Sequence, residues 1–316
     1  MSTTDLPSVA APPRGRPPRR RKAHRLSQRD RVILFVMAAV PAVIVVGLIW
    51  IPAVATVVLS FTSWDGFGAL SDAKNVGLKN YTDVVTIYPP FQPALQHNLI
   101  WLAFFFLVPT PLGILLAVLL DRELKGSRLF QTAFFMPVVI SLALTGFIWQ
   151  LIYSRDQGLL NAVLGLTGDR AVDWYGDSSV NLWAVLVAAS WKQTGYVMLL
   201  YLAGLKGVDG SLREAAAMDG ASLTRTFFSV VFPIMRPINV IILVITVIES
   251  LRAFDLVWVV NKGRNGLEVI GALVFSNIVG EGQRIGFGSA LASIMLVISL
   301  VFVVVYLSTV LREEKK

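Results

Sequence analysis

Polar side chains inside apolar segments are the first candidates for chemistry in this chain. Lys192 and Gln193 occur in one apolar segment, and Glu249, Arg252 and Asp255 occur in a later one. Charges are costly in hydrocarbon, so ionisable residues in such segments are typical of a path for a solute or an ion. Hydrogen bonds from these groups would suit a solute that carries hydroxyls.

Two arrangements of these residues remain open. Lys192 and Glu249 each lie about eleven residues into their segments, which places both near the middle of a membrane and lets them pair. Glu249 and Arg252 are three residues apart on one helix and could pair with each other instead. The set either only fixes helix packing through ion pairs or lines a path for a solute with hydroxyls. In the second case Trp149, Gln150 or Trp191 would also line it, and the tryptophan rings would stack on a ring of the solute.

Residues 206–237 form a polar interruption between two apolar segments, with the sequence KGVDGSLREAAAMDGASLTRTFFSVVFPIMRP. Ser211 and Glu214 have the spacing of a capping box, which predicts the start of a helix. Asp219 and Gly220 predict its end, since glycine readily takes the left-handed conformation. A second helix is expected from Ala221 to Phe232, closed by Pro233 and Pro237. The sequence therefore predicts a hairpin of two short helices.

The surface of this hairpin suits contact with another protein. Small residues allow close approach of a second backbone, and three phenylalanines could either anchor the hairpin to membrane helices or fill a cleft in a partner. These residues are Ala215, Ala216, Ala217, Gly220 and Ala221, followed by Phe227, Phe228 and Phe232. An ordinary interfacial loop is the alternative interpretation.

Composition indicates an all-α polytopic membrane protein. Of the 316 residues, 55% are apolar and 15% are charged, and a helix of roughly 20 apolar residues crosses roughly 30 Å of hydrocarbon. A barrel would show shorter, alternating segments. Six transmembrane helices are expected, at 32–60, 99–120, 133–152, 180–205, 238–260 and 285–311. Prolines inside them are expected to bend the helices locally, at Pro41, Pro52, Pro109, Pro111 and Pro137.

Basic residues predict the orientation. With the amino terminus inside, inner segments hold nineteen Lys and Arg, and outer segments hold seven, namely Lys74, Lys79, Arg155, Arg170, Lys262, Arg264 and Arg284. Both termini are therefore expected to be cytoplasmic. Residues 1–31 are expected to be a disordered basic arm that contacts anionic lipid, 32–311 a permease-like domain and 312–316 a tail. A signal-type cleavage site at Ala53-Val54-Ala55 and nucleic-acid binding by residues 17–22 are weaker alternatives.

Enzymatic parts are missing from the sequence. There is no cysteine, and the two histidines, His24 and His97, form no metal or catalytic pair. The HExxH, GxSxG and GxxxxGK[ST] patterns do not occur, so no catalytic residue and no metal ligand is predicted. If ATP drives transport, another chain must bind it.

The hairpin resembles the signature of permease subunits of binding-protein-dependent ABC importers. This signature has Glu-Ala-Ala, three residues, Gly, nine residues and an aliphatic-x-Leu-Pro ending. It is matched here by Glu214-Ala215-Ala216, Gly220, Val230, Phe232 and Pro233. Val230 stands where the family usually has Ile, and Phe232 where it usually has Leu. Both replacements keep the position apolar.

The resemblance extends over most of the six segments and is closest to carbohydrate and glycerol-phosphate importers, on the side of the maltose-type first permease subunit. It is carried by Phe135-Met136-Pro137, Trp149, Gly158-Leu159-Leu160-Asn161, Trp191 and Phe254-Asp255-Leu256. Residues 261–266 depart from the family, which often has a Gly-Gly-Pro turn there, so the outer loop and the exact solute are not predicted.

The resemblance implies the type I importer fold in the cytoplasmic membrane of a bacterium or archaeon. It also implies a second permease as heterodimer partner, two ATPase subunits that bind ATP and Mg²⁺, and an extracytoplasmic solute-binding protein; this chain would bind no cofactor and no nucleic acid. Coupling to the ATPase is expected at Glu214, Ala215, Ala216, Asp219, Gly220, Ala221 and Pro233. An ion-coupled secondary transporter that uses the buried charges is the rival interpretation.

Overall fold

The computed structural model describes residues 27–122, 126–280 and 282–313. In these ranges the chain forms helices and turns and no β-strand. One isolated bridge pairs Thr62 with Asn75. The chain divides into two units, Met1–Pro52 and Ala53–Lys316, which are described separately. Residues 1–26 of the expected basic arm lie outside the described residues. The last residues of the expected arm form the first turn of a helix.

The described chain begins with a helix of 32 residues, Gln28–Leu59. It consists of α1 (Gln28–Val45), a π-helical turn (Val46–Trp50) and α2 (Ile51–Leu59). The backbone N–H of Ser27 donates to the Asp30 carboxylate at 3.1 Å at the start of α1. The π turn ends just before Pro52, whose missing N–H interrupts the regular hydrogen-bond ladder.

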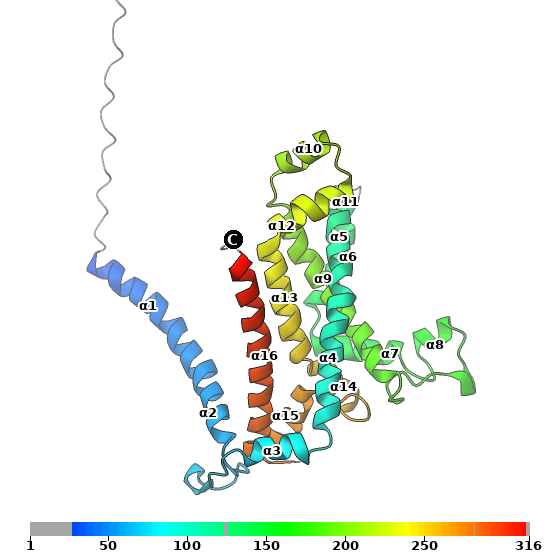
Figure 1. Ribbon diagram of the computed structural model, residues 1–316. Coiled ribbons are helices and arrows are strands. Elements are labelled where there is room, and N and C mark those ends of the chain that lie inside the picture. The colour runs from blue at the N-terminus through cyan, green and yellow to red at the C-terminus, as the bar shows by residue number, and fades with distance from the viewer. Residues whose placement is uncertain (1–26, 123–125, 281, 314–316) are drawn as a thin grey trace, which may run out of the picture. The chain divides into compact units, whose positions relative to one another are not determined.

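The second unit contains six long helices or helical segments. They are α4 (Phe91–Leu107), α5 (Pro109–Leu120), α6 (Ser127–Val139), α9 (Asn181–Leu205), α13 (Arg236–Leu251) and α16 (Ile285–Glu313). α5 and α6 pack along α9, whereas α4 and α16 pack on α13 (Figure 1). Leu186, Met198 and Tyr201 of α9 are fully buried, so this helix is the core of the unit.

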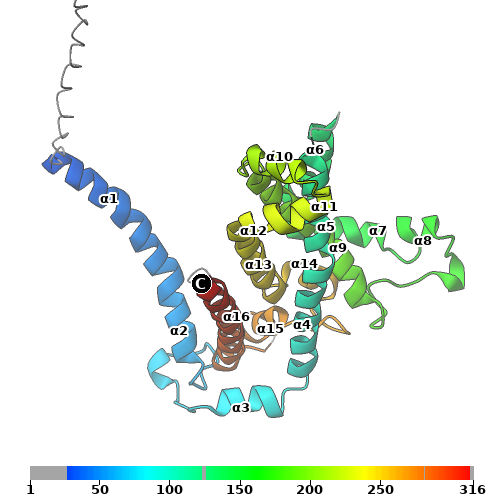
Figure 2. The same ribbon diagram turned by 45° about the horizontal axis from the view of Figure 1, so that its top comes forward.

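Shorter elements connect the long helices. They are a 3₁₀ turn (Leu70–Asp72), α3 (Lys79–Thr86), α7 (Leu142–Ile152), α8 (Leu159–Val163), a 3₁₀ turn (Gly168–Arg170), α10 (Gly210–Met218), α11 (Leu223–Thr226), a π turn (Phe227–Val231), α12 (Phe232–Ile234), α14 (Asp255–Asn261) and α15 (Ile270–Ile278). In both views α10 lies at one end of the second unit and α3 at the other (Figures 1 and 2).

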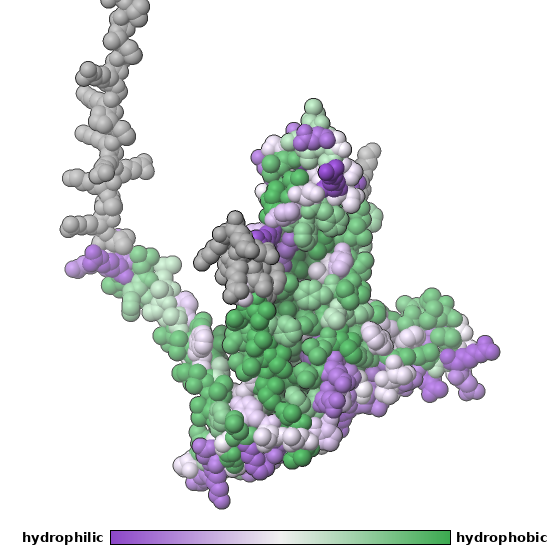
Figure 3. Space-filling view, in the orientation of Figure 1, coloured by the Kyte–Doolittle hydropathy of each residue, from purple (hydrophilic) through white to green (hydrophobic). Residues whose placement is uncertain are grey.

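Hydropathy is segregated along the second unit. Apolar side chains cover the flanks of its helices, and polar side chains gather at the end near α10 and at the end near α3 (Figure 3). A protein surface of this kind is stable only when hydrocarbon or another apolar surface covers the flanks. The second unit is therefore built to sit in a membrane.

Among the described residues, three helices are long and apolar enough to cross a membrane, or up to five if each bent pair counts as one span. Gln28–Leu59, Phe91–Leu120 and Ile285–Val305 agree with the predicted spans at 32–60, 99–120 and 285–311. The predicted span at 133–152 is not continuous, because it is broken between α6 and α7, which meet at an angle of 104°. The predicted span at 238–260 is likewise divided into α13 and α14.

The apolar segment at 267–279 is part of the core of the second unit. It contains α15, which packs on α4 and α16, and its residues Ile270, Ala272 and Leu273 are buried.

Two glycines allow the close packing around α9. A Cβ atom added to Gly195 would lie 2.1 Å from the Phe134 carbonyl oxygen in α6, and one added to Gly113 of α5 would lie 2.7 Å from the Val197 Cβ. Small residues let the backbones of membrane helices approach closely and gain van der Waals contact. The packing of α5 and α6 on α9 therefore requires that these two positions carry no side chain.

Asn98 joins three helices in the interior. Its amide nitrogen donates to the carbonyl oxygens of Ser250 at 3.0 Å and Leu251 at 3.3 Å, at the end of α13. The N–H of Ile270, at the start of α15, donates to its amide oxygen at 2.9 Å. Asn98 is fully buried, and it satisfies backbone groups that helix ends leave without partners.

Replacing Asn98 by leucine is expected to destabilise the fold strongly. The change leaves three buried backbone groups without a partner, and each costs about 1–3 kcal/mol. We expect a lower thermal unfolding temperature in detergent, measured by tryptophan fluorescence. Gln157→Leu, at an exposed side chain, is the control. Equal unfolding temperatures for the two variants would contradict the role of Asn98.

Candidate functional site

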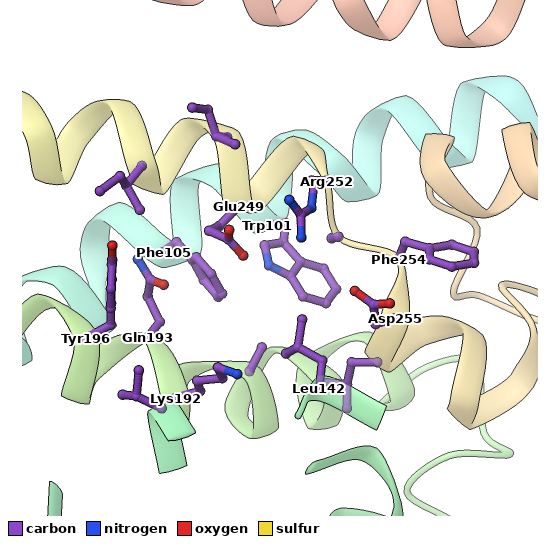
Figure 4. A pocket seen from close by; sticks show the side chains of 16 residues that line it. Trp101, Phe105, Leu142, Lys192, Gln193, Tyr196, Glu249, Arg252, Phe254 and Asp255 are labelled. Atoms are coloured by element: carbon purple, nitrogen blue, oxygen red, sulfur yellow. The ribbon is translucent and has the colours of Figure 1, made fainter. Parts of the chain in front are cut away.

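A cavity of about 400 Å³ lies between α4, the α6–α7 break, α9 and the α13–α14 connection (Figure 4). All five polar residues expected inside the membrane line it, namely Lys192, Gln193, Glu249, Arg252 and Asp255. Side chains of α9 face those of α13 across the cavity, with Trp101 between them. The structure thus brings together residues that are more than fifty positions apart in the sequence.

Lys192 is held at one wall of the cavity. Its Nζ donates to the carbonyl oxygen of Ile140 at 2.7 Å. Ile140 follows the last residue of α6, where carbonyl groups lack helical partners and the helix dipole favours a cation. Lys192 therefore stabilises the break between α6 and α7 while its stem borders the cavity.

Neither of the two possible ion pairs of Glu249 forms. Within the described ranges no ion pair joins Glu249 to Lys192 or to Arg252. Glu249 and Asp255 are partly buried, and Arg252 is exposed. The polar groups of the cavity are left available to a solute, because no ion pair among themselves occupies them.

Two N–H groups at the cavity are buried without a partner in the described part of the chain. They are the amide nitrogen of Gln193, whose residue is 6% exposed, and the indole nitrogen of Trp101, 3% exposed. A buried donor without a partner is unfavourable, so such groups are retained where a ligand or water accepts from them. Trp101 was not predicted, because a tryptophan in an apolar segment looks like any membrane helix residue.

Three of the eight expected path residues are not among those that line the cavity. Gln150 in α7 donates to the Val259 carbonyl oxygen at 3.0 Å and so ties α7 to α14. The rings of Trp149 and Trp191 meet edge to face at a centroid distance of 6.0 Å. These contacts place the three side chains in the packing between helices and not among the residues that line the cavity.

The hairpin begins two residues earlier than the sequence predicted. The first helix is α10, its N-cap is Asp209, and the Asp209 carboxylate accepts from the Ser211 N–H at 3.0 Å. The predicted capping box of Ser211 and Glu214 does not form, so this prediction is wrong. The Asp209 carboxyl accepts hydrogen bonds from the backbone of Ser211 and, with a smaller effect, from its side chain, and both lower the carboxyl pKa below its ordinary value. The carboxylate is therefore charged at neutral pH, and its negative charge stabilises the helix N-terminus.

The predicted end of the first hairpin helix is confirmed. The N–H of Ala221 donates to the Ala216 carbonyl oxygen and the N–H of Gly220 to that of Ala217, both at 3.0 Å. Gly220 has a φ of 75°. These bonds form a Schellman motif, in which glycine takes the left-handed position without steric cost. The Asp219-Gly220 turn is thus built by local chemistry.

The second hairpin helix is less regular than predicted. It consists of α11, a π turn and α12, and the π turn ends just before Pro233, which has no N–H to continue the ladder. Phe227 contacts the buried Tyr201 of α9 with ring centroids 6.4 Å apart, while Phe228 is 62% exposed. Phe227 anchors the hairpin to the bundle, and Phe228 is left on the surface.

The outer surface of the hairpin is open to a partner. Exposed residues include Glu214, Ala215, Asp219, Gly220 and Pro233, while Ala216 and Ala221 are partly buried. Met218 is 88% and Leu223 is 71% exposed. Large apolar side chains beside small residues, at a polar end of a membrane protein, are typical of a protein interface.

Arg213 attaches the hairpin to the bundle. Its Nη1 lies 2.7 Å from the Asp121 carboxylate at the end of α5, and its Nη2 donates to the Leu205 carbonyl oxygen at the end of α9. The two side chains are 36% and 15% exposed. These two contacts set how α10 lies on the two helix ends, and no sequence pattern indicated Asp121 as the partner of Arg213.

Arg213→Gln is expected to weaken this attachment only modestly. Partly exposed ion pairs contribute about 0.2–1 kcal/mol, so the protein should fold while the hairpin loses orientation. We expect less ATP hydrolysis by the ATPase subunits that the resemblance implies, measured in proteoliposomes, with normal protein levels. Arg225→Gln, at an exposed residue, should change neither. A loss of ATPase stimulation in both variants would assign the effect to charge alone.

Comparison with known proteins places this geometry in a family. Residues 109–313 match the model of the family described as binding-protein-dependent transport system inner membrane component. The xylose/arabinose import permease protein XacH of Haloferax volcanii is 32% identical over 245 residues, which cover 77% of this chain and 76% of that protein. The trehalose/maltose transport system permease protein MalF of Thermococcus litoralis is 32% identical over 237 residues, 73% of this chain and 78% of that protein.

Solved structures agree at the level of the fold. A chain of a bacterial ABC transporter involved in import of the acidic polysaccharide alginate superposes with a TM-score of 0.76 over 90% of this chain and 96% of that chain, at 18% identity. This chain therefore belongs to the family of binding-protein-dependent inner membrane components and is a permease subunit of an ABC transporter.

Proposed function

We propose that this permease imports a sugar or sugar-like solute and forms half of the translocation pathway, with the cavity as the part of the pathway contributed by this chain. The observation that carries the proposal is the cavity with two unpartnered buried N–H donors, Gln193 and Trp101. Its volume of about 400 Å³ falls in the range of small-ligand sites. Phe105 and Tyr196 supply aromatic faces on which a sugar ring can stack.

The solute that fits the cavity is neutral. Lys192 and Arg252 on the cavity wall balance Glu249 and Asp255 in formal charge, so an anionic sugar gains no net attraction. Hydroxyl groups can accept from the Gln193 and Trp101 N–H groups and donate to the two carboxylates. Pentoses, hexoses and their short oligomers have this chemistry, in keeping with the solutes named for the relatives from Haloferax and Thermococcus.

Coupling to ATP would act through the hairpin. The hairpin runs from the end of α9 to the start of α13, and these two helices carry facing walls of the cavity. A partner ATPase subunit that grips the hairpin would therefore move one wall relative to the other. Such a motion biases the cavity between two states from a distant site. ATP and Mg²⁺ would be bound by two ATPase subunits, and this chain would bind no cofactor.

The proposed assembly is a heterodimer with a second permease, an extracytoplasmic solute-binding protein and the ATPase pair. Six spans are proposed, with α9 as the polar central span that the other helices shield from lipid. The hairpin and both termini would be cytoplasmic in a bacterial or archaeal cytoplasmic membrane, in keeping with the distribution of Lys and Arg. The hairpin segment 206–237 would be the coupling loop of the permease domain.

A sugar screen tests the proposed function. The solute-binding protein encoded beside this chain is screened by thermal shift against neutral and anionic sugars, and uptake of the best ligand is measured in cells with and without this permease. We expect a neutral sugar to stabilise the binding protein and its uptake to require the permease. Stabilisation by anionic sugars alone, or uptake that persists without the permease, would overturn the proposal.

A further inference from the structure

The hydroxyl of Tyr201 has no partner in the interior of the second unit. Tyr201 lies in α9 and is 0% exposed, and within the described ranges its hydroxyl oxygen makes no hydrogen bond. The ring belongs to an apolar cluster built by α5, α9, the π turn of the hairpin and α13. A buried hydroxyl without a partner is unfavourable, and phenylalanine would fill the same space without that cost. The hydroxyl must therefore serve something other than packing.

The hairpin lies directly against this ring. The ring centroids of Tyr201 and Phe227 are 6.4 Å apart, and Val231 belongs to the same apolar cluster. Phe227 and Val231 are the first and last residues of the π turn, so one face of the turn packs on Tyr201. A movement of the hairpin relative to α9 therefore shifts this turn across the Tyr201 ring.

The π turn contains carbonyl groups that lack one backbone donor. Pro233 follows the turn and has no N–H, so it donates to neither Phe228 nor Ser229, the residues five and four positions before it. Such turns inside helices are frequent at functional sites. A hydroxyl without an acceptor thus lies beside a turn whose carbonyl groups can accept. In the described arrangement the two do not meet, because the Tyr201 hydroxyl makes no hydrogen bond.

We propose that Tyr201 is a positioning residue for coupling. In the described arrangement its ring packs on Phe227. In a second arrangement, reached when a partner ATPase moves the hairpin, its hydroxyl donates to a carbonyl group of the π turn. The second arrangement gains a hydrogen bond that the described one lacks, so the hairpin has two defined positions on α9. This inference rests on the proposed function, because it requires coupling to ATP through the hairpin.

Tyr201→Phe is expected to favour the described arrangement. It removes a hydroxyl that is unfavourable there, and it removes the donor that the second arrangement uses. More ATP is then needed to reach the second arrangement, because the state that ATP favours is less populated. We expect the ATP concentration for half-maximal ATP hydrolysis by the assembled transporter in proteoliposomes to rise about 2- to 10-fold. The thermal unfolding temperature of the full chain in detergent should not fall.

Tyr175→Phe is the matched control. The Tyr175 hydroxyl is also buried without a partner within the described ranges, but its ring packs on Tyr153, with centroids 5.1 Å apart. Tyr175 precedes α9, whereas the hairpin follows the other end of that helix. The control should leave the ATP dependence unchanged and should not lower the unfolding temperature. An equal rise in the ATP requirement of both variants would overturn the inference, because the effect would not depend on the hairpin.

Two further results would contradict the role of Tyr201. A lower unfolding temperature for Tyr201→Phe would show that the hydroxyl already has a partner, such as a buried water, in the described arrangement. An unchanged ATP dependence would show that the hydroxyl takes no part in coupling; if the ATPase still co-purifies with the unchanged chain and with Tyr201→Phe, the proposed function stands. If no ATPase co-purifies with the unchanged chain, the proposed function is wrong and this inference is wrong with it.

Discussion

Gly220→Asp is expected to abolish uptake and recruitment of the ATPase while the protein still inserts into the membrane. A Cβ atom at Gly220 would meet nothing within 4 Å, so the turn is not crowded within this chain. The positive φ of 75° costs a side chain about 1–2 kcal/mol. The main penalty must therefore arise where a partner covers the turn.

The size of that penalty follows from the charge. A carboxylate buried at an interface without a partner costs about 3–5 kcal/mol, which corresponds to a loss of roughly 100-fold or more in affinity for the ATPase. We expect the ATPase to be absent when the variant is purified from membranes, and uptake to fall to the background. Membrane levels of the variant should match those of the unchanged protein.

Gly220→Asn provides the matched control. Asparagine has nearly the size of aspartate, tolerates the left-handed conformation and carries no charge. We expect it to retain part of the ATPase that Gly220→Asp loses. If Gly220→Asp co-purifies undiminished amounts of the ATPase, the docking role of the hairpin is wrong. If both variants lose the ATPase equally, then the volume of the side chain decides recruitment and charge does not.

Gln193→Leu is expected to reduce transport about 10- to 100-fold without loss of assembly. Leucine keeps most of the volume but removes a buried N–H donor that has no partner within the described chain. A hydrogen bond that a site makes to its ligand contributes about 1–3 kcal/mol when its loss leaves a polar group unpaired. The effect should appear in sugar uptake by proteoliposomes, while ATP hydrolysis stimulated by the binding protein continues.

Gln150→Leu separates the cavity from helix packing. Gln150 is not among the cavity-lining residues, and its amide nitrogen donates to Val259. Its replacement should lower the thermal unfolding temperature and leave the sugar preference unchanged. If Gln193→Leu transports normally, the cavity is not the path. If it is lost from the membrane like a misfolded protein, Gln193 serves packing alone.

The hairpin shows what local sequence can predict. The turn at Asp219-Gly220 and the end of α10 follow from bonds between residues at most five positions apart, so the sequence contains all the necessary information. The start of the same helix was predicted wrongly because Asp209 and Ser211 both offer a cap, and the choice between them is small in free energy. The partner of Arg213 was not predictable, since Asp121 lies 92 positions away.

The cavity shows the limit of the same reasoning. Polar residues in apolar segments marked Lys192, Gln193, Glu249, Arg252 and Asp255 as a set, and the cavity contains all five. Neither of the two possible ion pairs of Glu249 forms, and a straight-helix register cannot foresee that α6 breaks and offers the Ile140 carbonyl to Lys192. Trp101 entered the site without any signal, since only the packing of α4 on α13 places its ring at the cavity.

The sequence by itself determined that this chain is helical, lies in a membrane and carries a helical hairpin between two apolar segments, because hydrophobicity, capping and turn chemistry act over a few neighbouring residues. Only the tertiary structure decided which spans are broken, which polar groups are left without partners and which apolar face remains uncovered. These properties depend on contacts between residues far apart in the chain, where one close approach, such as that of Gly195 to α6, changes the position of a whole helix.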